Sequence, residues 1–191
     1  MKTLFLDRDG VINPLVEVEN EKISPQDIGQ FRFYPKVKRA LEAAKENGYQ
    51  VIVFTNQPDV GKNWRDLDRA KLNEINLLLK ENNVDEVYEC THGPIGDSSN
   101  YHYGEDEITV CNCRKPQPSL IEKAAEDFDI TFSESFVVGD SVSDLEAAKN
   151  YEQKHSTNFR GKFIIGKETG LANRTFDNLY STINYITGEG S

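Results

Sequence analysis

The chain has no apolar run that approaches the ~20 residues of a membrane-spanning helix. Its N-terminal segment also lacks a signal-peptide hydrophobic region, because Asp7 and Arg8 interrupt it. Basic residues are few: 22 Lys and Arg stand against 32 Asp and Glu, and the formal net charge is −10. A basic face of the kind that binds nucleic acid is therefore not expected. These absences predict a cytoplasmic protein that binds neither membrane nor nucleic acid.

Cysteine is also scarce. The chain contains three cysteines, and an odd number argues against a disulfide framework. What is present is a well-mixed composition of 191 residues, with 37% hydrophobic and 28% charged residues. This length and composition suit one domain with a core of its own. We predict a single domain over residues 1–187, followed by a flexible tail at 188–191.

Short apolar runs alternate along the chain with segments of helical period. Residues 37–44, for example, place apolar side chains at the i, i+3, i+4, i+7 spacing of an amphipathic helix. Ser143 with Glu146 is typical of a capping box that begins a later helix. Such alternation predicts an α/β fold with a mainly parallel sheet flanked by helices. The expected strands are residues 4–6, 51–54, 84–88, 136–138 and, as the last, 163–165; the expected helices are 37–44, 67–81, 116–128, 143–148 and 178–186.

Polar side chains follow three of the predicted strands. Asp7 and Asp9 come after the first strand, Thr55 after the second, and Asp140 after the strand at 136–138. Ligands of parallel sheets bind beyond the carboxyl ends of the strands, so these side chains are expected at one edge. A single Asp there is ordinarily a helix cap or a turn residue. A cluster of carboxylates, however, repels itself unless a hard cation is bound, and oxygen ligands favour Mg²⁺.

Four segments resemble, in order, the motifs of haloacid-dehalogenase-type phosphatases. They are Asp-Arg-Asp-Gly-Val-Ile-Asn at 7–13, Thr-Asn-Gln at 55–57, Arg-Lys-Pro at 114–116 and Gly-Asp-Ser-Val-Ser-Asp at 139–144. The resemblance implies a Rossmann-like fold and hydrolysis of a phosphate ester through an aspartyl-phosphate intermediate on Asp7. It also implies that Asp9 acts as general acid and base. Mg²⁺ would be held by Asp7, the backbone carbonyl of Asp9, and Asp140.

The same resemblance implies roles for other residues. Thr55 would hydrogen-bond the transferring phosphoryl group, and Lys115 would stabilise its developing charge. Asp144 would support Lys115 or the metal, with Ser141 as a further supporting residue. Contacts with the substrate are expected from Asn56, Gln57 and Arg114.

Two short pairs, Cys90 with His92 and Cys111 with Cys113, supply four ligands of the kind that closed tetrahedral zinc sites use. A lone cysteine is ordinarily a small core residue, but here every cysteine of the chain belongs to one of the pairs. We predict a structural Zn²⁺ that closes the base of a loop over residues 90–113. The second pair leads directly into the Arg-Lys-Pro motif.

This pairing resembles the zinc-containing branch of the superfamily, which includes the heptose 1,7-bisphosphate phosphatases and the histidinol-phosphate phosphatases. The resemblance implies a compact monomer without a large cap domain. The opening motif and the long zinc loop favour D-glycero-D-manno-heptose 1,7-bisphosphate, with removal of the 7-phosphate. Arg114 suits a second phosphate or sugar hydroxyls, because its planar guanidinium binds in a bidentate manner. Lys62 and Arg65 would add positive charge near the Thr55 loop.

Two alternatives stay open. Histidinol phosphate is the first, because residues 101–107 are aromatic and acidic and would suit a cationic leaving group. Pro58-Asp59 and Ser141 also depart from the heptose-type pattern. The second is a noncatalytic phosphate-binding module, which predicts the loss of at least one catalytic residue. Asp7, Asp9, Lys115 and Asp140 are all present.

Overall fold

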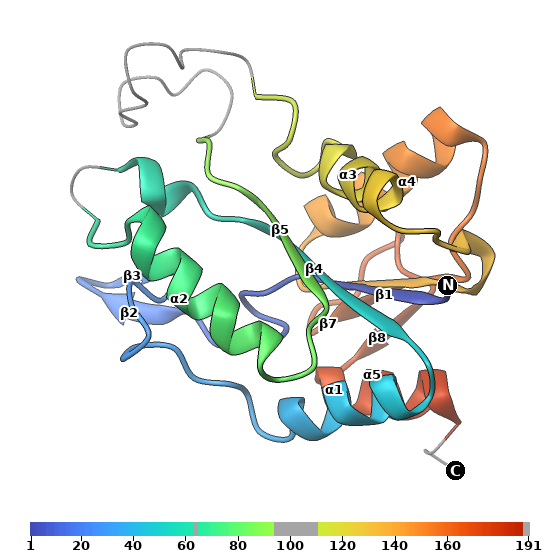
Figure 1. The fold of residues 1–191 in the computed structure, drawn as a ribbon, viewed down its shortest axis with the longest axis horizontal. Coiled ribbons are helices and arrows are strands. Elements are labelled where there is room, and N and C mark those ends of the chain that lie inside the picture. The colour runs from blue at the N-terminus through green and yellow to red at the C-terminus, as the bar shows by residue number, and fades with distance from the viewer. Residues whose placement is uncertain (63–64, 94–110, 189–191) are drawn as a thin grey trace.

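The computed structural model describes residues 1–62, 65–93 and 111–188 and contains a six-stranded sheet in the order β5-β4-β1-β6-β7-β8 (Figure 1). Every neighbouring pair is parallel. β1 is central, and all four of its residues are buried because helices cover both faces of the sheet. The predicted α/β fold with a mainly parallel sheet is confirmed. The strands are β1 (Thr3–Leu6), β4 (Gln50–Asn56), β5 (Glu86–Cys90), β6 (Phe136–Gly139), β7 (Gly161–Ile165) and β8 (Arg174–Phe176).

The helices form two layers, one on each face of the sheet. Leu4 and Leu6 of β1 belong to one core together with α1 (Val37–Glu46), α2 (Arg69–Lys80) and α5 (Leu179–Thr187). Phe5 points the other way, because side chains alternate along a strand. It belongs to the second core, with α3 (Ser119–Asp127) and α4 (Val142–His155). In Figure 1 the two layers lie below and above the sheet.

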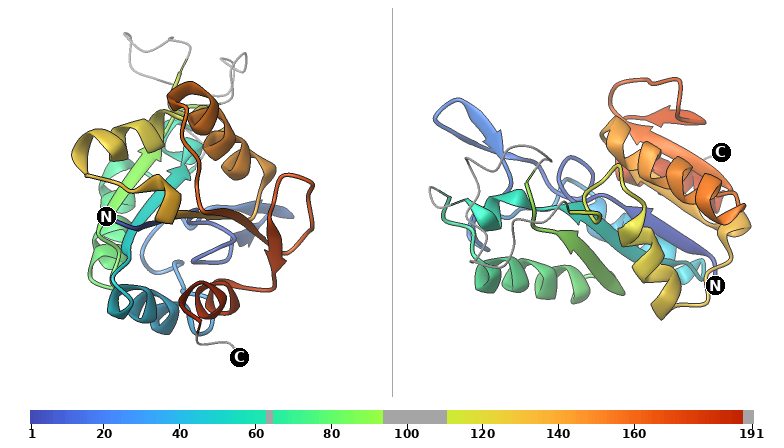
Figure 2. Two further views of the ribbon diagram at one scale, coloured as in Figure 1. Left: turned by 90° about the vertical axis from the view of Figure 1, so that its right-hand side faces the viewer. Right: turned by 90° about the horizontal axis from the view of Figure 1, so that it is seen from above.

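A small antiparallel hairpin, β2 (Val16–Val18) with β3 (Glu21–Ile23), follows β1 and stands off one end of the sheet (Figure 2). Its two turn residues, Glu19 and Asn20, have φ of 51° and 68°, the left-handed conformation that a tight type I′ hairpin turn requires. The sequence patterns did not predict this hairpin. No other inserted layer is present in the described residues, so they contain no large cap domain.

Several predicted element bounds are corrected by the structure. The capping box of α4 is formed by Ser141 and Asp144, not by Ser143 and Glu146: the Ser141 backbone N–H donates to the Asp144 carboxylate at 3.0 Å. β8 follows β7, so the strand at 163–165 is not the last one. β5 ends two residues later than expected, at Cys90.

Two predicted segments fall partly outside the described residues. These are the interior of the 90–113 loop and the end of the 188–191 tail. Gly188, with φ of 80°, ends α5 in the left-handed conformation that glycine favours. In the described part of the chain, no helix is long and apolar enough to cross a membrane.

Candidate active site

The carboxyl ends of β1 and β6 bring two aspartates together. Asp7 follows β1, and its backbone N–H donates to the carbonyl of Val138 on β6 at 3.0 Å. Asp140 follows β6 directly. Gly10 gives Asp140 its space, because a Cβ at this glycine would lie 2.0 Å from Asp140 Oδ2, and its φ of 87° also favours glycine. Neighbouring parallel strands therefore place both carboxylates at one edge of the sheet, as predicted.

Lys115 lies between two carboxylates in the interior. Its Nζ is 2.8 Å from Asp7 Oδ1 and 2.6 Å from Asp144 Oδ1, and it donates to the Phe54 carbonyl at 2.8 Å. The Lys115 side chain is 2% exposed. Burial alone would lower the pKa of Lys115, but Asp144 and Asp7 raise it above its ordinary value. The ammonium group is therefore held charged beside Asp7.

Asp7, Asp140 and Asp144 each offer an oxygen within 4.8 Å of the others, which is close enough to share a metal ion. Burial raises the pKa of Asp7 to about 7, and the charges of Asp144 and Asp140 add to this effect against that of Lys115. Burial and the Asp144 charge raise the pKa of Asp140 to about 6. Asp144 already binds Lys115 and the backbone of Ser141. Asp7 and Asp140 are thus the carboxylates best suited to a hard cation.

The Asp9 carboxylate is not part of this three-carboxylate cluster. It accepts hydrogen bonds from Arg8 at 3.0 Å, Asn13 at 2.7 Å, Ser24 at 2.9 Å and Gln57 at 2.7 Å. Burial would raise the pKa of Asp9, but Arg8 and the hydrogen bonds from Gln57 and Asn13 lower it below its ordinary value. Four donors therefore fix the orientation of this carboxylate.

All three predicted substrate contacts, Asn56, Gln57 and Arg114, have partners inside the protein. Asn56 clamps the backbone of Lys115: its Oδ1 accepts from the Lys115 N–H at 3.0 Å, and its Nδ2 donates to the Lys115 carbonyl at 3.3 Å. Gln57 is fully buried and donates to Asp9 and, at 2.9 Å, to the Thr55 hydroxyl. Arg114 donates to the carbonyl of His92 at 3.2 Å.

The predicted zinc ligands converge from β5 and from the segment before α3. Cys90, His92, Cys111 and Cys113 all place a ligand atom within 4.8 Å of one another. The Cys90 Sγ lies 3.4 Å from that of Cys111, and His92 Nδ1 lies 3.3 Å from Cys113 Sγ. All three cysteines are free thiols. A donor set of three sulfurs and one imidazole nitrogen at these separations fits a closed tetrahedral Zn²⁺ site.

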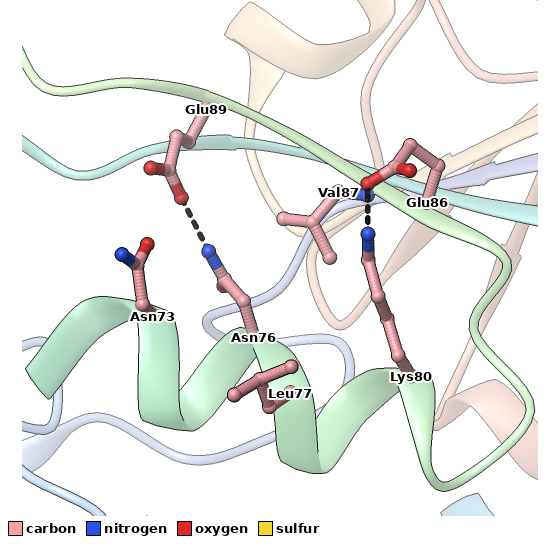
Figure 3. A pocket seen from close by; sticks show the side chains of 7 residues that line it. All are labelled: Asn73, Asn76, Leu77, Lys80, Glu86, Val87 and Glu89. Carbon is pink, nitrogen blue, oxygen red and sulfur yellow. Dashed lines mark hydrogen bonds and ion pairs between the residues drawn. The ribbon is translucent and has the colours of Figure 1, made fainter. Parts of the chain in front are cut away.

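An open cavity of about 500 Å³ adjoins Asp9, between the β2–β3 hairpin and the segment after β4. Its charged lining residues are four cations, Lys22, Lys62, Arg65 and Arg114, and three carboxylates, Asp9, Glu21 and Asp59. We call this space the cationic cavity. A second open groove, between α2 and β5, is lined by Asn73, Asn76 and Lys80 among others (Figure 3). None of the predicted catalytic residues lines that groove.

A family model described as haloacid dehalogenase-like hydrolase matches residues 26–151, more than half of the chain. The chain belongs to this hydrolase family. Thr55, Lys115 and Asp140 lie inside the matched range, whereas Asp7 and Asp9 precede it. The predicted superfamily is therefore confirmed.

Relatives of this hydrolase point to phosphatases. This chain is 33% identical over 160 residues to the D-glycero-beta-D-manno-heptose-1,7-bisphosphate 7-phosphatase of Helicobacter pylori, and the match covers 81% of this chain and 82% of the relative. It is 32% identical over 153 residues to the corresponding alpha-heptose enzyme of Photorhabdus laumondii, covering 78% and 77%. A crystal structure of D,D-heptose 1,7-bisphosphate phosphatase from B. bronchiseptica, complexed with magnesium and phosphate, has a TM-score of 0.71 at 23% identity and covers 99% of each chain.

The hydrolase site also contains residues that sequence reasoning did not single out. Arg8 is fully buried and binds both Asp9 and Gln57, the latter at 2.7 Å. Asn13 and Arg8 lie within the first motif, so their position in that motif was an available signal. Ser24 reaches Asp9 from the end of β3, and no pattern in the sequence pointed to it.

Proposed function

We propose that the protein removes the 7-phosphate of D-glycero-D-manno-heptose 1,7-bisphosphate through an aspartyl-phosphate on Asp7. The observation that supports this chemistry is the buried ion pair of Lys115, whose Nζ lies 2.8 Å from Asp7 Oδ1. Lys115 also forms an ion pair with a second carboxylate, that of Asp144. This arrangement brings a positive charge to the oxygen that would attack phosphorus. The phosphatase relatives support the substrate class.

In the first step, a carboxylate oxygen of Asp7 attacks phosphorus and the bond from phosphorus to the sugar oxygen breaks. Asp9 gives a proton to the leaving oxygen. The donors around Asp9 lower its pKa in the free protein, and the negative charge of a bound phosphate would raise it toward this acid role. Lys115 and Thr55 bind the oxygens of the transferring phosphoryl group.

In the second step, Asp9 takes a proton from water, whose oxygen attacks phosphorus. The bond from phosphorus to Asp7 then breaks, which releases inorganic phosphate, restores the Asp7 carboxylate and leaves Asp9 protonated, ready to act as the acid again. Asn13, Ser24 and Gln57 orient Asp9 for this role as a base. The residues that would hold Mg²⁺ are Asp7, Asp140 and the backbone carbonyl of Asp9, and the ion would neutralise negative charge on the phosphate.

The proposal also includes a structural Zn²⁺ on Cys90, His92, Cys111 and Cys113, and a cytoplasmic enzyme that acts as a monomer on a small molecule. Two of the zinc ligands, Cys111 and Cys113, lie just before Lys115 in the chain, so the ion would fix the path of the segment that carries this lysine. Residues 1–187 would form one domain, with 188–191 as its tail.

The cationic cavity favours the sugar bisphosphate over histidinol phosphate. Its cations outnumber its carboxylates in a chain whose formal net charge is −10, so positive charge is concentrated beside Asp9. A second phosphate would be attracted there, whereas the ammonium group of histidinol would be repelled. The acidic, aromatic residues 101–107, which supported histidinol phosphate, lie outside the described residues.

The test is phosphate release from both anomers of the heptose bisphosphate, fructose 1,6-bisphosphate and histidinol phosphate, with Mg²⁺. We expect one heptose anomer to be hydrolysed fastest and Asp7→Asn to be inactive. Asp177→Asn makes the same chemical change at an exposed position before α5 and should retain activity. Activity in Asp7→Asn would rule out the assigned nucleophile. Preference for histidinol phosphate would rule out the proposed substrate, and a protein that binds phosphate without turnover would be the noncatalytic module.

A further inference from the structure

Arg65 is held at the wall of the cationic cavity by buried polar groups. Asp59 is 4% exposed and accepts a hydrogen bond from Lys62 Nζ at 2.8 Å, while its Oδ1 lies 4.0 Å from Arg65 Nε. Gln26, also 4% exposed, donates to Asp59 at 3.2 Å and accepts from the backbone of Leu67 at 3.1 Å. Two cations are thus fixed in place before any ligand arrives, which lowers the entropy cost of binding an anion.

Glu21 reaches Arg65 from the opposite side of the cavity. It lies on β3 of the hairpin, and its carboxylate accepts a hydrogen bond from Arg65 Nη2. The two partners differ in exposure: the Glu21 side chain is 68% exposed and the Arg65 side chain 12%. An exposed glutamate forms only a weak ion pair, because water and salt screen it. A better anion can therefore displace Glu21 while Arg65 stays where it is.

Arg65 also has a hydrogen-bond donor that the described residues do not use. Its Nε is buried and donates no hydrogen bond within the described part of the chain. A guanidinium can bind two oxygens of a phosphate side by side, which a single carboxylate oxygen does not match. Asp9 lines the same cavity, so one molecule can place an anionic group at Arg65 and its leaving oxygen near Asp9.

We propose that Arg65, with Lys62, binds the second phosphate of the substrate, and that Glu21 on the β2–β3 hairpin competes for Arg65. Asp59 is a positioning residue that holds both cations at the cavity wall. This inference rests on the proposed function, since it concerns the part of a bisphosphate that is not hydrolysed. It makes the hairpin a specificity element, because a monophosphate has no group with which to displace Glu21.

The test compares kcat/KM for the heptose 1,7-bisphosphate with kcat/KM for the heptose 7-phosphate, which lacks the second phosphate. Arg65→Gln should lower this ratio by about 10- to 100-fold, chiefly through KM, as expected for the loss of a charged hydrogen bond. Glu21→Gln should raise the ratio severalfold, because the competitor loses its charge. Asp59→Asn should lower the ratio, because Lys62 and Arg65 lose their anchor. The matched control Arg69→Gln removes an exposed arginine that pairs with Glu89 and does not line the cavity, and it should leave the ratio unchanged.

A purely structural role for Arg65 would lower both kcat/KM values equally, and an unchanged ratio would overturn the proposal. A lower ratio in Glu21→Gln would overturn the competition. If the wild-type protein hydrolyses neither heptose substrate, the proposed function fails, and the same ratio for fructose 1,6-bisphosphate over fructose 6-phosphate then decides the phosphate subsite by itself. Absence of turnover on both pairs would overturn both proposals.

Discussion

At the scale of single residues, Asn56 holds the backbone of Lys115 by two hydrogen bonds. Its amide clamps both backbone polar groups of Lys115. We expect Asn56→Ala to lower kcat by about 10- to 100-fold with a smaller change in KM, because Lys115 would no longer be held to its position beside Asp7. Steady-state kinetics on the best substrate of the panel measures both constants.

Asn150 provides a matched control, because it binds Pro116, the residue that follows Lys115. Asn150 of α4 donates to the carbonyl of Pro116 at 2.9 Å, so it binds the same segment from the outside. Asn150→Ala removes an equivalent hydrogen bond and should change kcat little. If Asn56 instead contacts the substrate, as sequence reasoning predicted, KM will rise and kcat will be retained.

At the scale of elements, the cluster of Cys90, His92, Cys111 and Cys113 joins the end of β5 to the segment before α3. Hydrogen bonds from Cys90, Cys111 and His92 lower the pKa of Cys113 against the effect of burial, so this sulfur is disposed to be a thiolate ligand. We expect purified protein to contain about one zinc per chain. Cys113→Ala should lose the metal and destabilise the fold by at least about 2 kcal/mol, or roughly 4–8 °C in Tm. Metal analysis and thermal unfolding measure the two effects.

Asn112 provides the control for this experiment, because it is exposed and lies between two of the ligands. Asn112→Ala should keep both the zinc and the Tm. A wild-type protein without zinc, or a Cys113→Ala variant of unchanged stability, would contradict the structural metal site.

The strands also show which elements could be predicted from sequence patterns and which could not. β1 and β4 were predictable because each contains a continuous run of buried, mainly apolar residues between polar segments. β8 and the β2–β3 hairpin were missed because each strand has only three residues and none is fully buried. Too few side chains face a core there to produce a pattern.

The capping box was misplaced for a related reason. Ser141 and Ser143 both precede an acidic residue by three positions, and the pattern alone does not choose between Asp144 and Glu146. The choice comes from tertiary structure, since Asp144 is fully buried against Lys115. In the candidate site, likewise, the motifs named the residues that line the edge of the sheet. The partners of Asn56 and Gln57 arise from contacts between segments distant in sequence, which no local spacing encodes.

At the scale of the whole molecule, burial of the Asp7 carboxylate in the candidate site lowers the free energy of unfolding. Asp7 is 8% exposed, and Asp144 and Asp140 add negative charge near it. Its pKa rises from 3.8 to about 7 on folding, mainly through burial. The charged form is therefore less favourable in the folded chain than in the unfolded chain. Residues selected for chemistry commonly carry such a cost.

The pH dependence of this cost follows from its sign. A carboxyl group whose pKa is raised on folding destabilises the protein as the pH rises through the interval between the unfolded and folded values, here from 3.8 to about 7. Asp7→Asn removes the charge and keeps the shape. Without added Mg²⁺, we expect this variant to be more stable than the wild type by on the order of 2 kcal/mol above pH 7, with the difference vanishing toward pH 4.

Urea unfolding of both proteins at several pH values between 4 and 8 measures this difference, with Asp177→Asn as a control that should track the wild type. Added Mg²⁺ should stabilise the wild type more than Asp7→Asn, because a cation bound to the folded state relieves the repulsion among the carboxylates and the variant offers it a weaker ligand. The advantage of the variant should therefore shrink or reverse with the metal. A variant that is less stable than the wild type at pH 8 without Mg²⁺ would show that the Lys115–Asp7 ion pair outweighs the burial of Asp7, and that the site stabilises the fold that carries it.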